Sequence, residues 1–208
     1  MKASQLRRRL LCGLLAAPLA LSLAACKDKT PEQAAFTQLE GVNLSSADFA
    51  KDFSLTDTEG QRRTLADYRG KIVLIFFGFT QCPDVCPTAL TRAVDIKEQL
   101  GPDGDKIQVL FISVDPERDT PELLRAYMQA FDPGFVALRP ADDAELAQTA
   151  KDFKVFYQKV PTGSSYTMDH SALTYVYDTT GKLQIALRHT QTAEEAVADL
   201  RQVLALSR

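Results

Sequence analysis

Two cysteines four residues apart carry the most reactive chemistry in the sequence. Cys82 and Cys86 lie in the segment GFTQCPDVCP (residues 78–87), directly after an apolar run over residues 72–77. An apolar run that ends in glycine, followed by two thiols and a proline, indicates a strand, a loop and the start of a helix. At a helix start, unpaired N–H groups and the helix dipole favour a thiolate, which is both a nucleophile and a metal ligand. The pair therefore indicates either sulfur redox chemistry or soft-metal chemistry.

The cysteine count favours a functional pair over a structural disulfide. The two other cysteines, Cys12 and Cys26, fall within and directly after a segment that resembles a signal peptide. In an oxidising compartment, the two remaining thiols would default to a disulfide. A disulfide across four residues closes a very small loop and stabilises a fold little, so we expect Cys82 and Cys86 to serve a function.

Histidine is the informative partner of the thiols, because the chain holds only His170 and His189. His170 precedes a predicted strand and follows residues 161–167, which we expect to be a mobile, exposed loop able to fold over a site. His189 lies between a predicted strand and the last helix, as a solvated connector would. Two thiolates and one imidazole suit copper or zinc. A structural zinc site needs a fourth protein ligand, which no second cysteine pair supplies, so copper and an open zinc site remain as alternatives.

The first 25 residues have the features of a secretory signal peptide. Four basic residues precede an apolar run over residues 10–23, which Pro18 interrupts and which is shorter than a membrane-spanning helix. The sequence LAAC (residues 23–26) resembles the bacterial lipobox, so we expect Cys26 to become the lipidated first residue. The alternative is an ordinary cleaved signal in which Cys26 is incidental. Residues 26–47 are mostly polar, and we assign them to a tether.

The charge balance excludes some functions. The chain has 24 basic and 27 acidic residues, and residues 1–25 hold four of the basic ones and no acid, so the rest carries a formal charge of −7. An acidic domain is poorly suited to nucleic acid, which requires basic patches. Attachment to a membrane would depend on acyl chains at Cys26 rather than on charge. The remaining length suits one domain with its own core, which we place at residues 48–208.

Alternating strand and helix patterns predict an α/β sheet for this domain. Two strands joined by a turn at residues 58–60 are expected to form an N-terminal hairpin, and two more a hairpin near the C-terminus, which makes the sheet mixed. The expected strands cover residues 53–57, 62–65, 72–79, 107–114, 155–159, 172–178 and 183–188. The expected helices cover residues 88–100, with Pro87 as the first residue, and residues 119–131, 142–152 and 192–206.

Three segments together resemble the SCO/SenC family. They are GFTQCPDVCP (78–87), SVDPERDTP (113–121) and DHS (169–171), the last followed by YVYD (175–178) and Gly181, in the family's order. The resemblance extends from about residue 48 to the C-terminus and implies a thioredoxin-like fold with an N-terminal β-hairpin extension. It also implies one copper ion, Cu(I) or Cu(II), bound by Cys82, Cys86 and His170. Asp115 matches an acidic family position near the metal loop, where we expect it either to support the ligands or to cap the turn at Pro116.

The resemblance implies a metallochaperone rather than an enzyme. Family members are associated with assembly of the dinuclear copper centre of cytochrome c oxidase, by delivering copper, by reducing cysteines of that centre, or both. We therefore expect a protein anchored by lipid at the periplasmic face of the inner membrane. Its expected partners are the copper-site subunit of the oxidase and another periplasmic copper carrier.

Three other functions remain as alternatives: a thiol–disulfide oxidoreductase, a peroxidase and a non-enzymatic redox or copper sensor, about which the sequence gives no further indication. In a thiol–disulfide oxidoreductase, Cys82 would attack and Cys86 would resolve the mixed disulfide, but such motifs are usually C-x-x-C and His170 would have no evident task. A peroxidase needs an activated cysteine near a threonine and an arginine. Thr80 is present, but no arginine is placed by motif.

Overall fold

The computed structural model describes residues 36–206, so the predicted signal peptide and Cys26 lie outside the described residues. An eight-stranded mixed sheet forms the centre, and a two-stranded sheet stands beside it. The strands are β1 Val42–Asn43, β2 Ser54–Asp57, β3 Arg62–Thr64, β4 Ile72–Gly78, β5 Ile107–Ser113, β6 Val136–Arg139, β7 Tyr157–Thr162, β8 Ser165–His170, β9 Thr174–Tyr177 and β10 Leu183–Leu187. The helices are α1 Val85–Leu100, α2 Pro121–Gln129, α3 Asp143–Phe153 and α4 Ala193–Leu206, with 3-10 turns η1 Leu65–Tyr68 and η2 Gly101–Lys106.

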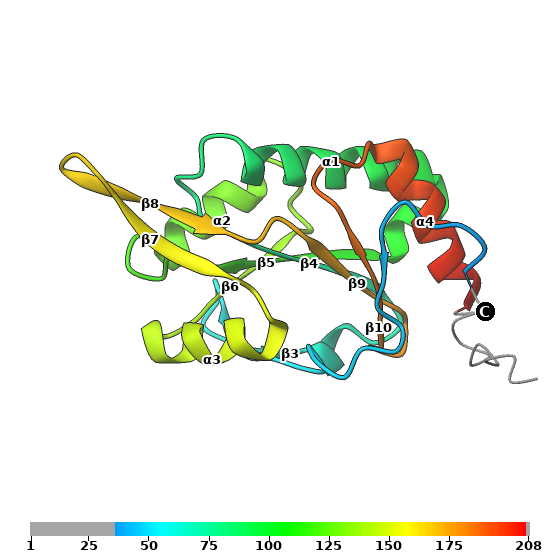
Figure 1. Cartoon of the computed structure of the whole chain (residues 1–208), viewed down its shortest axis with the longest axis horizontal. Helices are drawn as coiled ribbons and strands as arrows, with labels where there is room; N and C mark the ends of the chain where they lie inside the picture. The colour runs from blue at the N-terminus through cyan, green and yellow to red at the C-terminus, as the bar shows by residue number, and fades with distance from the viewer. Residues whose placement is uncertain (1–35, 207–208) are drawn as a thin grey trace, which may run out of the picture.

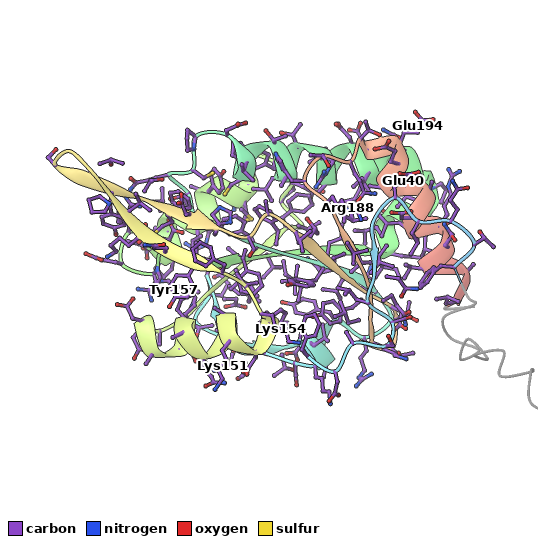
Figure 2. The ribbon with its side chains drawn as sticks, viewed as in Figure 1. Glu40, Lys151, Lys154, Tyr157, Arg188 and Glu194 are labelled. Carbon is purple, nitrogen blue, oxygen red and sulfur yellow. The ribbon has the colours of Figure 1, made fainter. Side chains whose placement is uncertain are left out.

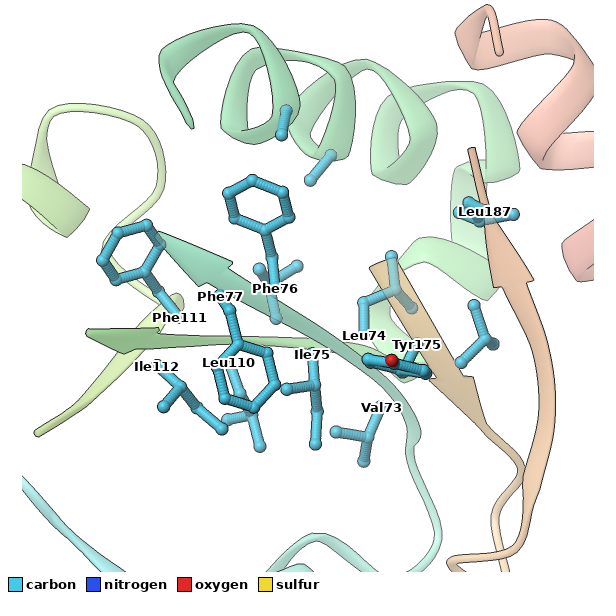
Figure 3. Close-up of a cluster of buried hydrophobic side chains, with 14 of the residues drawn as sticks. Val73, Leu74, Ile75, Phe76, Phe77, Leu110, Phe111, Ile112, Tyr175 and Leu187 are labelled. Carbon is cyan, nitrogen blue, oxygen red and sulfur yellow. The ribbon is translucent and has the colours of Figure 1, made fainter. Parts of the chain in front are cut away.

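The strand order of the large sheet is β1-β10-β9-β4-β5-β6-β2-β3. Helices α1 and α4 lie together on one face of the sheet, and α3 lies on the other (Figure 1). Strand β4 is buried at every position, as its unbroken apolar run predicts. Phe76 and Phe111 point towards α1, whereas Phe77 points to the opposite face (Figure 3). The predicted mixed α/β architecture is confirmed.

Strand pairing brings three distant segments to one edge of the sheet. Strands β4 and β5 are parallel with Gly78 opposite Ser113, so the segments that follow them leave at the same edge. Strand β9 is antiparallel to β4 with Thr174 opposite Phe76, so the chain that enters β9 arrives at that edge as well. The carboxyl edge of parallel strands is a common position for binding sites. Here it collects the thiol segment, the segment after β5 and His170.

Helix α1 begins earlier than the sequence predicts. It starts at Val85 with Asp84 at the N-cap, rather than at residue 88 with Pro87 first, so Cys86 lies in its first turn. The N–H groups of the first turn have no partner within the helix, so Pro87 costs no hydrogen bond at the third helical position. The early start places the Cys86 thiol at the positive end of the helix dipole.

The prediction of a mobile loop over residues 161–167 is wrong. Strands β7 and β8 form an antiparallel hairpin that pairs Tyr157 with His170 and Pro161 with Tyr166, with Gly163 in the turn at φ +59°. A two-stranded ribbon has a free edge on each side, so the missing N–H of Pro161 is tolerated there. The hairpin extends away from the main body (Figure 1). His170 is therefore the last residue of a strand, and the strand expected at 155–159 begins at Tyr157.

The chain before β2 is attached to the C-terminal part of the fold. Strands β2 and β3 form the predicted N-terminal hairpin, which is confirmed. Strand β1, within the range assigned to the tether, pairs with β10. The buried Asp199 carboxylate accepts hydrogen bonds from the N–H groups of Glu40 and Gly41, and the Arg188 guanidinium donates to the Glu40 carbonyl (Figure 2). Among residues 36–206, no helix has the length and apolar character needed to cross a membrane.

Candidate metal centre

The structure brings together the three residues predicted as ligands. One ligand atom from each of Cys82, Cys86 and His170 lies within 4.8 Å of the others. Cys86 Sγ lies 3.5 Å from His170 Nε2. A thiolate and an imidazole bound to one ion at about 2.3 and 2.0 Å, with an angle of 120°, would be about 3.7 Å apart. The observed separation fits a shared metal ion with little movement, and both thiols are unbridged.

The two thiols differ in exposure and in charge. Cys82 is partly exposed in the loop before α1, whereas Cys86 is buried behind it and donates its N–H to Cys82 Sγ at 3.4 Å. Hydrogen bonding from the Cys86 thiol, helped by His170 and by backbone N–H groups and opposed by burial, lowers the pKa of Cys82 to about 3. The same pairing, together with burial, raises the pKa of Cys86. Cys82 is thus the thiolate and the accessible sulfur of the pair.

We expect Cys82 to react selectively with iodoacetamide in the reduced, copper-free protein. Its pKa of about 3 lies below both pH 5 and pH 7, so the rate of Cys82 alkylation should be nearly equal at the two pH values. Cys86 should stay unmodified because it is buried. Mass spectrometry of peptides measures both rates. In denaturant, thiol pKa values return to about 8.5, so the rate of Cys82 alkylation should fall about 100-fold from pH 7 to pH 5. The same fall in the folded protein would contradict a stabilised thiolate.

Hydrogen bonding and ring contacts orient His170. Its Nδ1 lies 3.0 Å from the carbonyl oxygen of Ser171, and since a carbonyl only accepts, Nδ1 carries the proton and donates. Nε2 then faces the thiols and is the nitrogen left to bind a metal ion, the arrangement common for metal-binding histidines. The rings of Phe76 and Phe79 contact the imidazole edge-on at centroid distances of 6.0 and 5.9 Å. His170 is therefore a preorganised donor on a strand.

A buried carboxylate anchors the segment that leads to the thiols. Asp119 is fully buried and accepts hydrogen bonds from the N–H and hydroxyl of Thr80 and from the hydroxyl of Ser113. Burial raises the pKa of Asp119. The N–H of Val114 also donates to the Gly78 carbonyl at 2.8 Å. These bonds tie the segment before Cys82 to the segment after β5.

Asp115 belongs to a second group of contacts beside the thiols. Its carboxylate pairs with Arg118 and accepts a hydrogen bond from the Tyr166 hydroxyl at 2.9 Å. The Arg118 guanidinium lies 3.6 Å from the centre of the Tyr166 ring and donates to the Gln81 side chain and to the Tyr166 carbonyl. We call Asp115, Arg118 and Tyr166 the Arg118 cluster. It connects the thiol loop to the hairpin that carries His170.

A cleft of about 290 Å³ opens beside the thiols. Its lining includes Cys82 and His170, the buried thioether side chain of Met168 and the exposed ring of Phe156. His189 is not among the residues that line it; the carbonyl of His189 accepts a hydrogen bond from Arg92. The cleft gives a second molecule access to Cys82.

Sequence reasoning missed the roles of Arg118, Asp119 and Phe156. The first two lie in the segment that carries the family resemblance. Their contacts with Thr80, Gln81 and Tyr166 join positions 37 to 48 residues apart, so no local pattern indicates these contacts. Phe156 comes three residues after the end of α3, and the sequence analysis placed it in a strand over residues 155–159. The signal that could have marked it is its place one residue before a hairpin, which the composition of residues 161–167 concealed.

Comparison with known proteins agrees with the site. The model of the SCO1/SenC family matches residues 42–205. The chain belongs to the SCO1/SenC family. It is 36% identical to the SCO2-like protein of Rickettsia felis over 176 residues, which cover 83% of this chain and 82% of that one. It is also 34% identical to the human mitochondrial SCO2 homolog, over 97% of this chain and 76% of the human protein.

Solved structures of SCO1/SenC proteins share the fold. Copper-bound ScoI of Bradyrhizobium japonicum is 44% identical, with a TM-score of 0.66 over 73% of this chain and 97% of that structure. Copper-bound yeast Sco1 is 30% identical, with a TM-score of 0.66 over 74% of this chain and 87% of that one. The predicted thioredoxin-like fold is confirmed. Homologous structures thus carry copper, and this chain presents two thiols and an imidazole that fit one ion.

Proposed function

We propose that this protein is a copper chaperone that binds one Cu(I) or Cu(II) ion through Cys82, Cys86 and His170 and delivers it to the copper-site subunit of cytochrome c oxidase. The observation that carries the proposal is the convergence of these three ligand atoms within 4.8 Å. Thiolate and imidazole ligands favour copper over hard cations. The copper bound in homologous structures supports the choice of copper over zinc. Another periplasmic copper carrier is the proposed donor.

Release of the ion would follow from the unequal exposure of the ligands. His170 lies at the end of strand β8 with Nδ1 bonded to the Ser171 carbonyl, so the proposal does not require His170 to move when the ion is released. Cys82 is the exposed sulfur, and the cleft beside it admits an acceptor thiolate. Exchange of Cys82 for that thiolate would loosen the ion while Cys86 and His170 still hold it. Copper is the cargo in this scheme: the bond between copper and Cys82 would be replaced by a bond to the acceptor thiolate, and no covalent bond within the protein changes.

The proposed location is the periplasmic face of the inner membrane, with acyl chains at Cys26 as the anchor. The LAAC sequence at residues 23–26 and the basic and apolar segments before it support this location. The respiratory partner favours the inner membrane over the outer one. Labelling of growing cells with a radioactive fatty acid tests the anchor, because label should be lost in Cys26→Ser and kept in Cys12→Ser.

Copper titration tests the ligand set. The reduced protein, titrated without oxygen, should bind one equivalent of copper. Cys82→Ala, Cys86→Ala and His170→Ala should each weaken binding more than about 100-fold, because removing a residue that only supports a ligand already costs 10–100-fold. His189→Ala is the matched control, since His189 lies outside the cleft, and should bind like the wild type. Unchanged affinity in all three ligand variants would sink the proposal.

A thiol–disulfide reductase acting on the acceptor's cysteines is the second candidate. The observation that favours it is a thiolate at Cys82 with the buried Cys86 directly behind, an arrangement suited to attack and resolution. Reduction of a disulfide in the acceptor's copper site would leave Cys82 and Cys86 oxidised to a disulfide. Turnover that persists in His170→Ala while copper binding is lost would favour this candidate.

A further inference from the structure

Phe156 is an exposed aromatic side chain held rigidly beside the metal ligands. It is 58% exposed, and among residues 36–206 the only other large exposed apolar residues are Leu123 and Leu206. Both polar groups of its backbone bond to Ser171, the neighbour of His170: its N–H donates to the Ser171 hydroxyl at 3.0 Å and its carbonyl accepts from the Ser171 N–H at 2.9 Å. The ring is therefore presented to solvent from a fixed backbone.

The rim of the cleft combines apolar surface with negative charge. Phe156, Pro83 and Val85 provide exposed or half-exposed apolar surface around Cys82. Asp84 and Asp169 are exposed and line the same cleft, and no lysine or arginine is among the lining residues that the structure describes. An exposed apolar patch with a polar rim is characteristic of a protein–protein contact.

We infer that this cleft is the docking surface for the copper acceptor, with Phe156 as its apolar anchor and the two aspartates selecting a partner that carries lysine or arginine beside its copper-binding cysteines. The inference rests on the proposed function and names the surface through which delivery occurs. Cys82 lines the cleft and Cys86 is buried, so an acceptor thiolate that reaches the ion through the cleft meets Cys82 in a cleft that Phe156 also lines. A nucleic acid or an anionic membrane does not fit, because both would be repelled by the carboxylates.

Phe156 is predicted to contribute to the affinity for the acceptor through one large apolar contact. Aromatic residues near the centre of an interface often dominate its affinity, and their truncation commonly costs tenfold or more. The paired charges would act mainly on the rate of association, which falls as salt screens them. The contribution of Phe156 to affinity and the contribution of the charges to the association rate can be measured separately, because the first depends on burial of the ring and the second on ionic strength.

The test compares Phe156→Ser with Leu123→Ser in the copper-loaded full chain. Leu123 is 41% exposed on α2 and does not line the cleft, so it matches Phe156 in class and exposure. The probe is the copper-free soluble domain that holds the dinuclear copper site of cytochrome c oxidase, and stopped-flow absorbance measures the rate constant of transfer. We expect Phe156→Ser to lower that rate constant about tenfold and Leu123→Ser to leave it unchanged. A copper titration of each variant separates docking from copper affinity.

The charge selection is tested by the salt dependence of the same rate constant. The rate constant should fall as ionic strength rises, and Asp169→Asn should flatten that dependence, whereas Asp143→Asn on α3 should not. Asp143 is also exposed but lies on a helix at the opposite face of the sheet (Figure 1).

The remaining outcomes distinguish failure of the docking surface from failure of the proposed chaperone function. Equal transfer by Phe156→Ser and Leu123→Ser would overturn the docking surface and leave the chaperone intact. A wild-type chain that binds copper but transfers none would overturn both. Conversion of a dimer to a monomer by Phe156→Ser, measured by light scattering, would show that a second copy of the chain occupies the cleft and would overturn the inference.

Discussion

Arg118→Leu is expected to lower the free energy of unfolding by about 3 kcal/mol, because it leaves a buried carboxylate without its partner. Asp115 is 2% exposed, and the Arg118 side chain with which it pairs is 16% exposed. The substitution also removes the contact of the guanidinium with the Tyr166 ring and its hydrogen bonds to Gln81 and the Tyr166 carbonyl. Urea denaturation measures the loss. Amide hydrogens of β8 should exchange faster, because the cluster attaches the hairpin to the body.

Arg125→Leu is the matched control for this prediction. Arg125 also pairs with a carboxylate, that of Glu59 at 2.9 Å, but the two side chains are 37% and 66% exposed. Exposed pairs typically contribute about 0–1 kcal/mol, so the control should lose little stability. Adding Asp115→Asn to Arg118→Leu should recover part of the loss, because the buried charge is then gone. Equal losses for Arg118→Leu and Arg125→Leu would show that burial of the first pair has no energetic consequence.

The elements with a clear hydrophobic pattern were predictable from the sequence. The unbroken apolar run of residues 72–77 predicts the buried strand β4, and it forms with Gly78 as its last residue. The end of α1 at Gly101 follows from the glycine, which adopts φ +59° there. The start of α1 was missed because Pro87 was expected as the first helical residue. It is tolerated two positions later, where no hydrogen bond depends on it.

The β7–β8 hairpin could not be predicted from composition. Its turn region, from Pro161 through Gly163 to Ser165, is rich in residues typical of loops, yet Pro161 pairs with Tyr166 in register. Local propensity was overridden by pairing between strands, which depends on both segments at once. The error had a functional consequence, because it placed His170 on a mobile loop, whereas the structure holds it at the end of a strand with Nδ1 bonded to Ser171.

The metal ligands were predicted from residue types, spacing and the family resemblance, whereas the strands and helices were predicted from hydrophobic patterns. Cysteine spacing indicated Cys82 and Cys86, and Cys86 is 84 positions from His170 along the chain. The scarcity of histidine and the position of His170 before a predicted strand made it a candidate, and the family resemblance then implied that it is a ligand. In physical terms, the pair meets because β9 runs antiparallel to β4 with Thr174 opposite Phe76. That pairing is a tertiary property of the whole sheet, and no local pattern encodes it.

Gly78→Ala is expected to damage both the core and the metal site, because Gly78 allows the thiol and a ring to approach the backbone. A methyl group at this position would lie 2.8 Å from Cys86 Sγ and 2.8 Å from a carbon of the Phe111 ring. Both distances are shorter than a van der Waals contact, and Cys86 and Phe111 are fully buried, so neither can move into solvent. Overpacking of this kind typically costs 1–3 kcal/mol.

The effect of Gly78→Ala on copper binding depends on whether the Cys86 Sγ or the Phe111 ring moves away from the added methyl group. Displacement of Cys86 Sγ changes its 3.5 Å separation from His170 Nε2, so copper should bind at least about tenfold more weakly, in line with the 10–100-fold cost of disturbing a ligand's support. Gly134→Ala is the control, since a methyl group there meets only the Asp132 carboxylate, at 3.1 Å, and Lys97 at 4.0 Å. Calorimetric unfolding and copper titration of the two variants check the prediction. Loss of stability in Gly78→Ala with unchanged copper affinity would mean that the Phe111 ring moves and the thiol keeps its place.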